Sequence, residues 1–467
     1  MSKTDRRQFL RNITIGGSAV AAGLHSQDAY ALNYPSLPDA VNMSGFAVPK
    51  MDKVRIGFIG LGMRGSDAVQ RVSFIEGIEI KAICDKLKDR VEKSNQALVK
   101  SGLPAAKGYD GNDGWKAMLE NEDLDLVYIC TPWSLHTPMA VAAMKAGKNA
   151  ATEVPAARTL DECWQLVETS EKTKKHCMML ENCCYDFFEL LTLNMARNGM
   201  FGELVHAEGA YIHDLRSLNF AKDGYVDMWR LKENATRNGD LYPTHGLGPI
   251  AQCLNINRGD RMDHLVSMST NDFQMGAMAK EKAATDDFYK PFADKKFRGN
   301  MNTTLIRTEK GKTIMVQHDV TSPRPYSRIH LISGTKGMAQ KWPSPAKIAF
   351  GHEWVKAEEF KALEEKYTPP IVKHIGDIAK NVGGHGGMDF IMDWRLIDCL
   401  RNGLPLDQDV YDAALWSSIA PLSEASIAKR SRTVDVPDFT RGKWKTNTPH
   451  DLTLNGGGTT TVRAVNK

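Results

Sequence analysis

Apolar and polar residues alternate over residues 54–59, where Val54, Ile56 and Phe58 occupy every second position. This period of two predicts a β-strand. Three glycines follow, then a short segment with helical spacing, and then a strand-like run over residues 79–85. Strand, helix and strand in this order predict one βαβ unit.

The alternation of strand and helix patterns continues to residue 182. Residues 124–130 form a nearly continuous apolar run, which is typical of a strand buried in a parallel sheet. Helices are predicted over residues 90–100, 115–120, 137–146 and 160–173, and further short strands over residues 147–152 and 177–181. We therefore expect an N-terminal Rossmann dinucleotide-binding domain over residues 53–182.

The pattern changes after about residue 185. Alternating runs over residues 205–211, 304–307 and 313–319 predict an antiparallel sheet, and helical patterns occupy residues 187–197, 388–400 and 410–429. The predicted fold class is α/β, with the Rossmann domain followed by a C-terminal α+β domain over residues 183–440 that has a largely antiparallel open sheet. Residues 441–467 are expected to form a tail, and its Gly-rich part after Asn455 is predicted to be flexible or an oligomer contact.

The first 31 residues differ in character from the rest of the chain. Arg6 and Arg7 precede an apolar, small-residue run over residues 13–24, and Ala29-Tyr30-Ala31 matches a cleavage signal. This order resembles a twin-arginine signal peptide over residues 1–31, followed by a linker over residues 32–52. It predicts export to the periplasm or outer surface of a bacterium, and a basic amphipathic or disordered leader is the alternative. No stretch after residue 50 is apolar for long enough to span a bilayer.

Composition narrows the range of partners. The formal net charge of +4 is small for 467 residues and gives no reason to expect nucleic acid. The eight cysteines lie mostly in apolar patterns, which favours buried thiols. The vicinal pair Cys183-Cys184 suits metal or redox chemistry as well as packing, and packing is preferred because no C-x-x-C or histidine cluster accompanies it. His213 and Asp214 suggest a metal, but no second ligand set has convincing spacing, so no metal is predicted.

The pattern Gly60-x-Gly62-x-x-Gly65 indicates what the βαβ unit binds. The first glycine permits a tight turn, the second lets backbone N–H groups approach a pyrophosphate, and the third lets the helix pack close to the strand. Asp85, about 20 residues beyond the last glycine, is placed to accept hydrogen bonds from the adenosine ribose. An acid there favours NAD over NADP because it repels a 2′-phosphate. Such glycines also mark ordinary turns, but the complete order of elements predicts dinucleotide binding.

The glycine pattern and Asp85, together with Thr131-Pro132, His136, the Glu153-x-Pro155 turn and His245, resemble the Gfo/Idh/MocA oxidoreductase superfamily over residues 53–430. In that superfamily the turn normally reads Glu-Lys-Pro, and its lysine assists proton transfer at the carbinol that is oxidised. Here the position is Val154, which cannot donate or accept a proton. The resemblance therefore puts ordinary dehydrogenase chemistry in doubt.

Val154 and the sequences of several further stretches resemble those of the NAD-dependent glycosidases of glycoside hydrolase family 109. These stretches are residues 181–185, 209–211, 229–230, 242–246 and 383–389. The characteristic activity of that family is removal of terminal α-linked N-acetylgalactosamine from glycans. The resemblance thus implies an enzyme with NAD as cofactor and a glycan or small molecule as substrate. Resemblance to the superfamily also implies a homo-oligomer.

The resemblance implies a route that differs from the two-carboxylate plan of most glycosidases. The sugar is oxidised at C3 by NAD⁺, a base removes the acidified C2 proton, and the aglycone leaves from C1. Water then adds and the sugar is reduced again. NAD is regenerated in each turnover, which suits an exported enzyme that cannot replace a lost cofactor.

His245 is the first candidate for proton transfer at C3 or C2, because histidine exchanges a proton while making an oriented hydrogen bond; a packing role at the turn is the alternative. Tyr242 is the second catalytic candidate, or else a sheet aromatic. The resemblance implies substrate contacts from Tyr211, Arg230, Tyr242, Pro243, Thr244, His245 and Tyr326. It implies cofactor contacts from Gly60, Gly62, Met63, Arg64, Gly65, Asp85, Thr131, Trp133, Ser134, Leu135, His136, Thr137, Glu153, Val154, Asn182 and Tyr242.

Several assignments stay open at this stage. Arg230 beside Trp229 could be only a surface pair, Glu153 only a charge at a helix start, and His385 could line the site from its glycine-rich setting. A periplasmic sugar or inositol oxidoreductase with a tightly bound cofactor is the main alternative function. A sugar sensor that carries a dinucleotide is the third.

Overall fold

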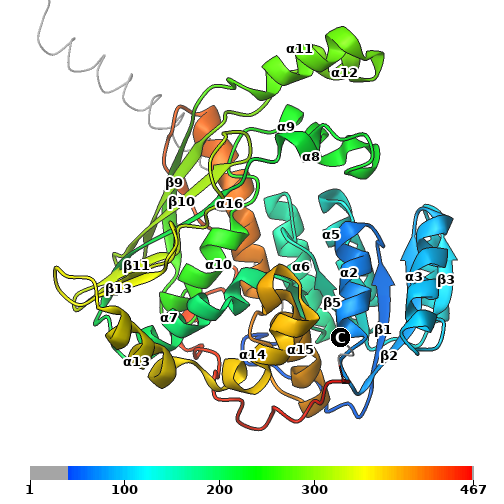
Figure 1. Ribbon diagram of the computed structural model, residues 1–467, viewed down its shortest axis with the longest axis horizontal. Helices are drawn as coiled ribbons and strands as arrows, with labels where there is room; N and C mark the ends of the chain where they lie inside the picture. The colour runs from blue at the N-terminus through cyan, green and yellow to red at the C-terminus, as the bar shows by residue number, and fades with distance from the viewer. Residues whose placement is uncertain (1–39, 465–467) are drawn as a thin grey trace, which may run out of the picture.

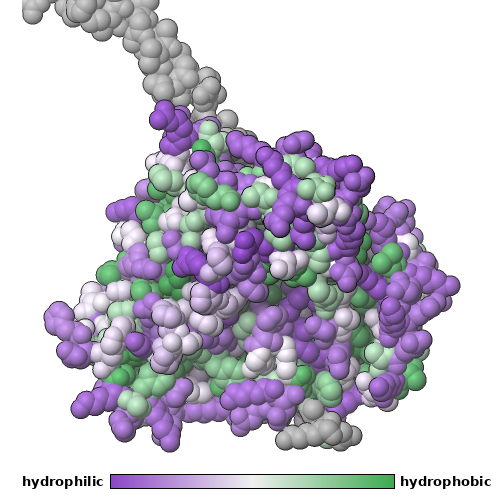
Figure 2. Space-filling view, turned by 45° about the horizontal axis from the view of Figure 1, so that its top comes forward, coloured by the Kyte–Doolittle hydropathy of each residue, from purple (hydrophilic) through white to green (hydrophobic). Residues whose placement is uncertain are grey.

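The computed structural model describes residues 40–464, so the predicted signal peptide and the first part of the linker lie outside the described residues. The described chain forms two sheets, which lie in the right-hand and left-hand parts of Figure 1. Hydrophilic side chains dominate the face in Figure 2, with smaller apolar patches between them. Among the described residues, no helix has the length and apolarity needed to cross a membrane.

The first sheet has six parallel strands in the order β3-β2-β1-β4-β5-β6. This is the order of a Rossmann fold and confirms the predicted domain type. The strands are β1 (Val54–Ile59), β2 (Ile78–Asp85), β3 (Lys107–Asp110), β4 (Leu126–Ile129), β5 (Asn149–Thr152) and β6 (Cys177–Met179). The helices are α2 (Met63–Val72), α3 (Lys88–Lys100), α4 (Gly114–Asn121), α5 (Trp133–Lys145) and α6 (Leu160–Thr173).

The helix and strand boundaries in this domain differ from the sequence prediction by up to four residues, and β3 was not predicted; the largest difference is at the start of α5. Helix α5 begins at Trp133, four residues before the predicted start at Thr137. Pro132 supplies the N-cap position and is followed directly by helical backbone, so residues 133–136 form the first helical turn rather than a loop. Trp133 and His136 are therefore held on a rigid element at the carboxyl end of β4.

The second sheet has eight strands in the order β13-β12-β11-β7-β10-β9-β8-β14. Neighbouring strands are antiparallel except β7 and β10, which are parallel, so the predicted largely antiparallel sheet is confirmed. The strands are β7 (Leu204–Ile212), β8 (Met262–Ser269), β9 (Asn302–Thr308), β10 (Thr313–Asp319), β11 (Leu331–Gly334), β12 (Met338–Gln340), β13 (Lys347–Ala349) and β14 (Val434–Asp435).

Helices cover one face of this sheet (Figure 1). Helix α10 (Thr244–Cys253) crosses β7 closely, because a Cβ on Gly209 would lie 2.3 Å from the backbone oxygen of Gly246. Helix α16 (Val410–Ala428) is buried on nearly all sides and packs against β8 as well as against α6 and β6 of the first domain. The two domains therefore share one continuous core.

The remaining helices lie around these layers. They are α7 (Phe187–Arg197), α8 (Arg216–Asn219), α9 (Trp229–Thr236), α11 (Met275–Thr285), α12 (Lys290–Ala293), α13 (Ala357–Tyr367), α14 (Pro370–Val382) and α15 (Met388–Asn402). The described part of the Gly-rich tail packs against residues of both domains. Trp394 Nε1 donates to the Thr460 carbonyl at 2.9 Å, and Glu76 N donates to the Thr461 carbonyl at 2.9 Å.

Candidate active site

The glycine loop between β1 and α2 leaves an open backbone cradle. Gly60 has φ +88°, and a Cβ at Gly65 would lie 1.7 Å from the Gly60 oxygen, so both positions require glycine. Helix α2 has no side-chain cap at Gly62, which leaves the first N–H groups free for an anion. The loop has the form that a pyrophosphate requires.

Asp85 closes the loop from the next strand. Its carboxylate accepts hydrogen bonds from Leu61 N at 2.6 Å and Leu87 N at 2.9 Å. Arg90 Nη1 lies 3.7 Å from Asp85 and would lie 3.2 Å from a Cβ at Gly62. Asp85 therefore shapes the cradle, and its predicted contact with the ribose stays a prediction. Arg90 was missed because nothing in its local sequence marks it.

The segment after β4 borders the same cradle. The Thr131 hydroxyl is buried without a hydrogen-bond partner among the described residues, and Thr131 N would lie 3.0 Å from a Cβ at Gly60. His136 sits between the Thr131 and Pro155 carbonyl oxygens, each at 2.7 Å, and burial lowers its pKa. His136 thus holds the backbone of this segment in place. Ser134 and Leu135 are exposed on the first turn of α5, and Thr137 Oγ1 donates to the Ala156 carbonyl at 2.8 Å. The open cradle and the free Thr131 hydroxyl beside it fit a dinucleotide.

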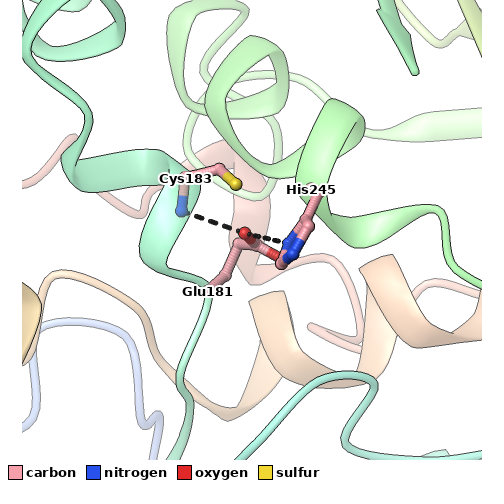
Figure 3. Close-up of side chains that lie close together, drawn as sticks. All are labelled: Glu181, Cys183 and His245. Atoms are coloured by element: carbon pink, nitrogen blue, oxygen red, sulfur yellow. Dashed lines mark hydrogen bonds and ion pairs between the residues drawn. The ribbon is translucent and has the colours of Figure 1, made fainter. Parts of the chain in front are cut away.

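A histidine and a carboxylate meet where the two domains join (Figure 3). His245 Nδ1, in the first turn of α10, lies 2.8 Å and 3.0 Å from the two oxygens of Glu181, which follows β6. Burial of Glu181 opposes ionisation, but His245 and its hydrogen bonds lower the carboxyl pKa below its usual value. An ionised carboxylate only accepts, so Nδ1 carries the proton and Nε2 is left as the basic nitrogen. His245 therefore has a buried acid as its partner, and its role in proton transfer stays a prediction.

Aromatic side chains extend from this dyad toward the dinucleotide domain. Tyr242 stacks on Trp133 at 5.7 Å between ring centroids and contacts His245 at 4.8 Å and Tyr211 at 4.7 Å. Tyr326 lies 6.2 Å from Tyr211. Burial raises the pKa of Tyr242, so its phenol stays protonated and acts as a donor. Tyr242 thus links the predicted substrate residues to the Rossmann domain, as a cofactor and substrate contact requires.

Arg230 is a buried cation among these rings. Its guanidinium lies 5.2 Å from the Trp133 ring centroid and 5.0 Å from that of Tyr242, and Nη1 donates to Tyr225 Oη at 2.9 Å. Among the residues that the structure describes, it forms no ion pair with a carboxylate. The alternative of a surface pair with Trp229 is wrong, since Arg230 is 7% exposed. The charge is available for a substrate acceptor.

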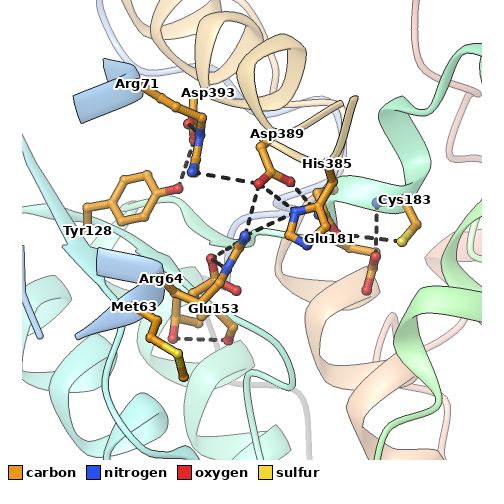
Figure 4. A network of polar contacts seen from close by, with 12 residues as sticks. Met63, Arg64, Arg71, Tyr128, Glu153, Glu181, Cys183, His385, Asp389 and Asp393 are labelled. Atoms are coloured by element: carbon orange, nitrogen blue, oxygen red, sulfur yellow. Dashed lines mark hydrogen bonds and ion pairs between the residues drawn. The ribbon is translucent and has the colours of Figure 1, made fainter. Parts of the chain in front are cut away.

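His385 and Asp389 form a second pair of a histidine and a carboxylate (Figure 4). His385 Nδ1 is 2.8 Å from Asp389 Oδ2, and Asp389 also receives Arg64 Nη1 at 2.9 Å and a hydrogen bond from Asn182. Arg64 also contacts Glu153 at 2.8 Å. The Arg64 side chain therefore pairs with two acids, Asp389 and Glu153. Glu153 thus takes part in an ion pair between elements and is not only a charge at a helix start. The Arg64 backbone remains in the first turn of α2, beside the exposed Met63.

The loop that carries His385 has an unusual backbone. Residues 383–387 all have positive φ, and His385 itself has φ +46°. Its side chain is 57% exposed, whereas the Asp389 side chain is 1% exposed. The four glycines make this conformation accessible at little cost. The sequence drew attention to His385, but its partner Asp389 follows only from the structure.

The other residues of interest have ordinary roles. Val154 is buried, and Pro243 and Thr244 form the start of α10. Asp214 is paired with Arg216 at 2.7 Å, and His213 Nδ1 lies 3.2 Å from Tyr211 Oη. His213 and Asp214 therefore each have a different side-chain partner. The eight cysteines are all free thiols, and only Cys130 is partly exposed.

Comparison with known proteins gives the same two-domain division. Residues 54–181 match the model of an oxidoreductase family with an NAD-binding Rossmann fold, and residues 185–446 match the C-terminal domain of glycosyl hydrolase 109. An alpha-N-acetylgalactosaminidase of Bacteroides fragilis is 52% identical over 415 residues, covering 87% of this chain and 97% of that protein. A glycosyl hydrolase family 109 protein of Porphyromonas gingivalis is 50% identical over 450 residues, covering 91% and 94%.

Solved structures share the fold at lower identity. Levoglucosan dehydrogenase in complex with NADH and levoglucosan has a TM-score of 0.60 at 17% identity and covers 83% of this chain and 100% of its own. Scyllo-inositol dehydrogenase from Lactobacillus casei, in its apo form, has a TM-score of 0.59 at 13% identity, covering 83% and 99%. NAD is the dinucleotide of the first domain.

Proposed function

The chain belongs to glycoside hydrolase family 109, and we propose that it hydrolyses terminal α-linked N-acetylgalactosamine through transient oxidation of the sugar. The relative from Bacteroides fragilis, named for this activity, supports the substrate. The observation that carries the chemistry is the His245–Glu181 pair, which lies beside the tyrosines and against the dinucleotide domain. NAD-dependent glycosidases are an exception to the mechanism in which two carboxylates flank the scissile bond.

The chain's own residues would hold the cofactor at the cradle. The N–H groups after Gly62 would hold the pyrophosphate, Asp85 would accept from the adenosine ribose, and Thr131 would supply its free hydroxyl. Glu153 and Asn182, which follow β5 and β6, would contact the nicotinamide ribose. When bound there, NAD supplies a reversible oxidation of the sugar at C3, and it is regenerated within each turnover.

His245 moves the first protons. Its Nδ1–H is held by Glu181, so Nε2 accepts a proton from the C3 hydroxyl or from C2. Glu181 stabilises the imidazolium that results, because the ionised carboxylate lies within 3.0 Å. Tyr242 stays protonated and orients a sugar hydroxyl by donation. Removal of the C2 proton expels the aglycone from C1.

Arg230, Tyr211 and Tyr326 hold the sugar ring. The buried guanidinium donates to a hydroxyl or to the acetamido carbonyl, and this contact is strong because the surroundings exclude water. Tyr211 and Tyr326 are largely buried, and burial raises the pKa of both phenols, so both remain donors. These contacts favour a substrate with several hydroxyl and amide acceptors.

His385 protonates the leaving oxygen and later activates water. Asp389 fixes its Nδ1, so Nε2 faces the exposed side of the loop. A departing alkoxide needs a proton donor, and an exposed imidazole can exchange that proton with solvent.

The proposal also includes export from the cytoplasm and self-association. The twin-arginine pattern supports export as a folded protein with its cofactor bound. The second sheet carries exposed Val205, Met268 and Leu305 on its strands, which supports self-association through that face. Secretion of a reporter fused to residues 1–31, and the mass of the purified protein in solution, test the two points.

The activity is tested by release of nitrophenol from an aryl α-N-acetylgalactosaminide with no added NAD, together with deuterium incorporation at C2 in heavy water. Release with incorporation supports the proposal. Absence of release with NADH accumulating on free sugars would favour the oxidoreductase alternative, and binding without any turnover would favour a sensor.

A further inference from the structure

Three side chains with different donor atoms converge at the base of the active site. Glu181, Cys183 and His245 each present one ligand atom, and these atoms all lie within 4.8 Å of one another. Figure 3 shows the three side chains arising from two elements, the segment after β6 and the start of α10. Carboxylate oxygen, thiol sulfur and imidazole nitrogen are the three kinds of ligand that zinc takes in proteins.

We propose that Glu181, Cys183 and His245 form an inhibitory site for a zinc-class divalent cation. The spacing suits such an ion, because tetrahedral zinc with bonds of roughly 2.0–2.3 Å separates its ligands by roughly 3.3–3.8 Å. The carboxylate and imidazole now lie 2.8 Å apart and need to open slightly, while the sulfur needs to move inward. Small side-chain rotations about fixed backbone positions are enough.

The fourth coordination position would face Tyr211 and Tyr242. Glu181 and Cys183 are fully buried, whereas the His245 side chain is 14% exposed and borders Tyr211 and Tyr242. An ion can therefore enter only from the side where the sugar binds. A water molecule or a substrate hydroxyl completes the tetrahedron, as in zinc sites with three protein ligands.

The charges and protons balance in this site. Burial raises the pKa of the Cys183 thiol, so it is neutral without a metal, and coordination breaks the S–H bond and forms the S–Zn bond. One proton goes to solvent, and the imidazole proton moves from Nδ1 to Nε2. The ion carries +2 and the thiolate and carboxylate carry −1 each, so the complex is neutral and suits a buried position.

The same tautomer change accounts for inhibition, and this step rests on the proposed function. His245 acts as a base only while Glu181 keeps the proton on Nδ1. With the metal on Nδ1, Nε2 carries the remaining proton and can no longer accept one. The ion thus blocks proton removal without displacing the dinucleotide.

The test titrates the purified enzyme, with its NAD, with Zn²⁺ and with Cd²⁺, whose bond to a thiolate absorbs in the near ultraviolet. One equivalent of Cd²⁺ should produce this absorption, and Zn²⁺ should remove the absorption by displacing Cd²⁺. Zn²⁺ should also inhibit the glycosidase activity, and a chelator should restore that activity. Because the Cd²⁺ absorption is read without any sugar, it tests the site even if the glycosidase activity is absent.

Two neighbouring cysteines provide the variant and its control. Cys183→Ser keeps the backbone N–H that donates to Glu181 at 3.1 Å, so we expect its metal-free activity to persist. It should lose the Cd²⁺ absorption and need at least roughly tenfold more Zn²⁺ for inhibition. Cys184→Ser should behave as the parent, because Cys184 is not one of the three ligands.

Three outcomes would overturn the site. They are no Cd²⁺ absorption with the parent enzyme, absorption and inhibition unchanged in Cys183→Ser, or absorption lost in Cys184→Ser. If Cys183→Ser does not fold, the parent and Cys184→Ser decide the question by themselves.

Discussion

Arg64, in the first turn of the first Rossmann helix, donates from Nη1 to Asp389 Oδ2 at 2.9 Å, across 325 positions of sequence. The same carboxylate lies 3.6 Å from Arg71 Nη1 and 2.8 Å from His385 Nδ1. Arg64 also contacts Glu153. The dinucleotide loop and the loop that carries His385 are therefore joined through one buried acid.

Asp389→Asn should loosen this junction. Burial disfavours the charged carboxylate, but His385, Arg64 and Arg71 together hold its pKa well below the usual range. Loss of the charge leaves Arg64 with Glu153 and Arg71 with Asp393 as their remaining acidic partners, and we expect the free energy of unfolding to fall by about 3 kcal/mol. Urea denaturation measures this. Asp377→Asn, on a side chain that is 99% exposed, should change stability very little, and equal effects would contradict the account.

His385→Ala should separate substrates by their leaving groups. A natural glycan departs as a basic alkoxide and needs a proton, so its kcat/KM should fall by roughly 10²- to 10⁴-fold. A nitrophenyl glycoside leaves without protonation and should lose far less. Kinetics on the two substrates measure the difference, and His352→Ala, an exposed histidine outside the site, is the control. A similar loss on both substrates would remove His385 as the acid.

His245→Gln should abolish proton transfer while the cofactor stays bound. We expect a loss of kcat of roughly 10²- to 10⁴-fold, because glutamine cannot accept a proton at neutral pH. Absorbance of the purified variant reports whether NAD is retained, and hydrogen exchange at C2 reports the base. Glu181→Gln should lose less, since it still accepts from Nδ1 of His245. Retained C2 exchange in His245→Gln would assign that step to another residue.

The Rossmann domain was predictable because its evidence is local. Val54, Gly60 and Asp85 lie within 32 residues, and the spacing of such residues reports directly on a βαβ unit. The long-range contacts of the candidate site were not predictable in the same way. Glu181 meets His245 over 64 positions and Asp389 meets Arg64 over 325, and such pairs depend on how the sheets and helices pack.

The start of α5 shows a different limit of the sequence. The sequence predicts that this helix begins at Thr137, whereas α5 begins one turn earlier, at Trp133. A proline at the N-cap followed by a bulky aromatic residue is compatible with a loop and with a helix. The packing of Trp133 against Trp229 and Tyr242 favours the helix. Long-range contacts thus set the local boundary.

Gly209→Ala should affect activity as well as stability. The added Cβ would lie 2.3 Å from the Gly246 oxygen and 2.9 Å from its Cα, so β7 and α10 must separate. We expect a loss of about 1–3 kcal/mol in unfolding free energy. Because α10 carries His245, kcat should fall too. Gly102→Ala, with φ +76° and open space around the Cβ, should cost stability through its backbone alone and leave kcat unchanged.

Three buried histidines should make the protein lose stability in mild acid. Burial lowers the pKa of His176 to about 4, of His330 to about 3 and of His450 to about 4. The unfolded chain binds these protons near pH 6.5 and the folded chain does not, so stability is fully present above that pH and falls as the pH drops toward 4. Each histidine should contribute about 1 kcal/mol per pH unit in this window.

Urea unfolding of His176→Gln at several values of pH between 7 and 4.5 checks this assignment. Glutamine binds no proton in either state, so the variant should show a shallower fall in unfolding free energy by about 1 kcal/mol per pH unit. His352→Gln, at an exposed position, should keep the slope of the parent. An unchanged slope in His176→Gln would mean that the folded protein protonates His176 as readily as the unfolded chain does. Any fall in stability below about pH 5 would then come from buried carboxylates with a lowered pKa, such as Glu189, whose pKa Arg328 and Lys341 hold at about 2 despite its burial.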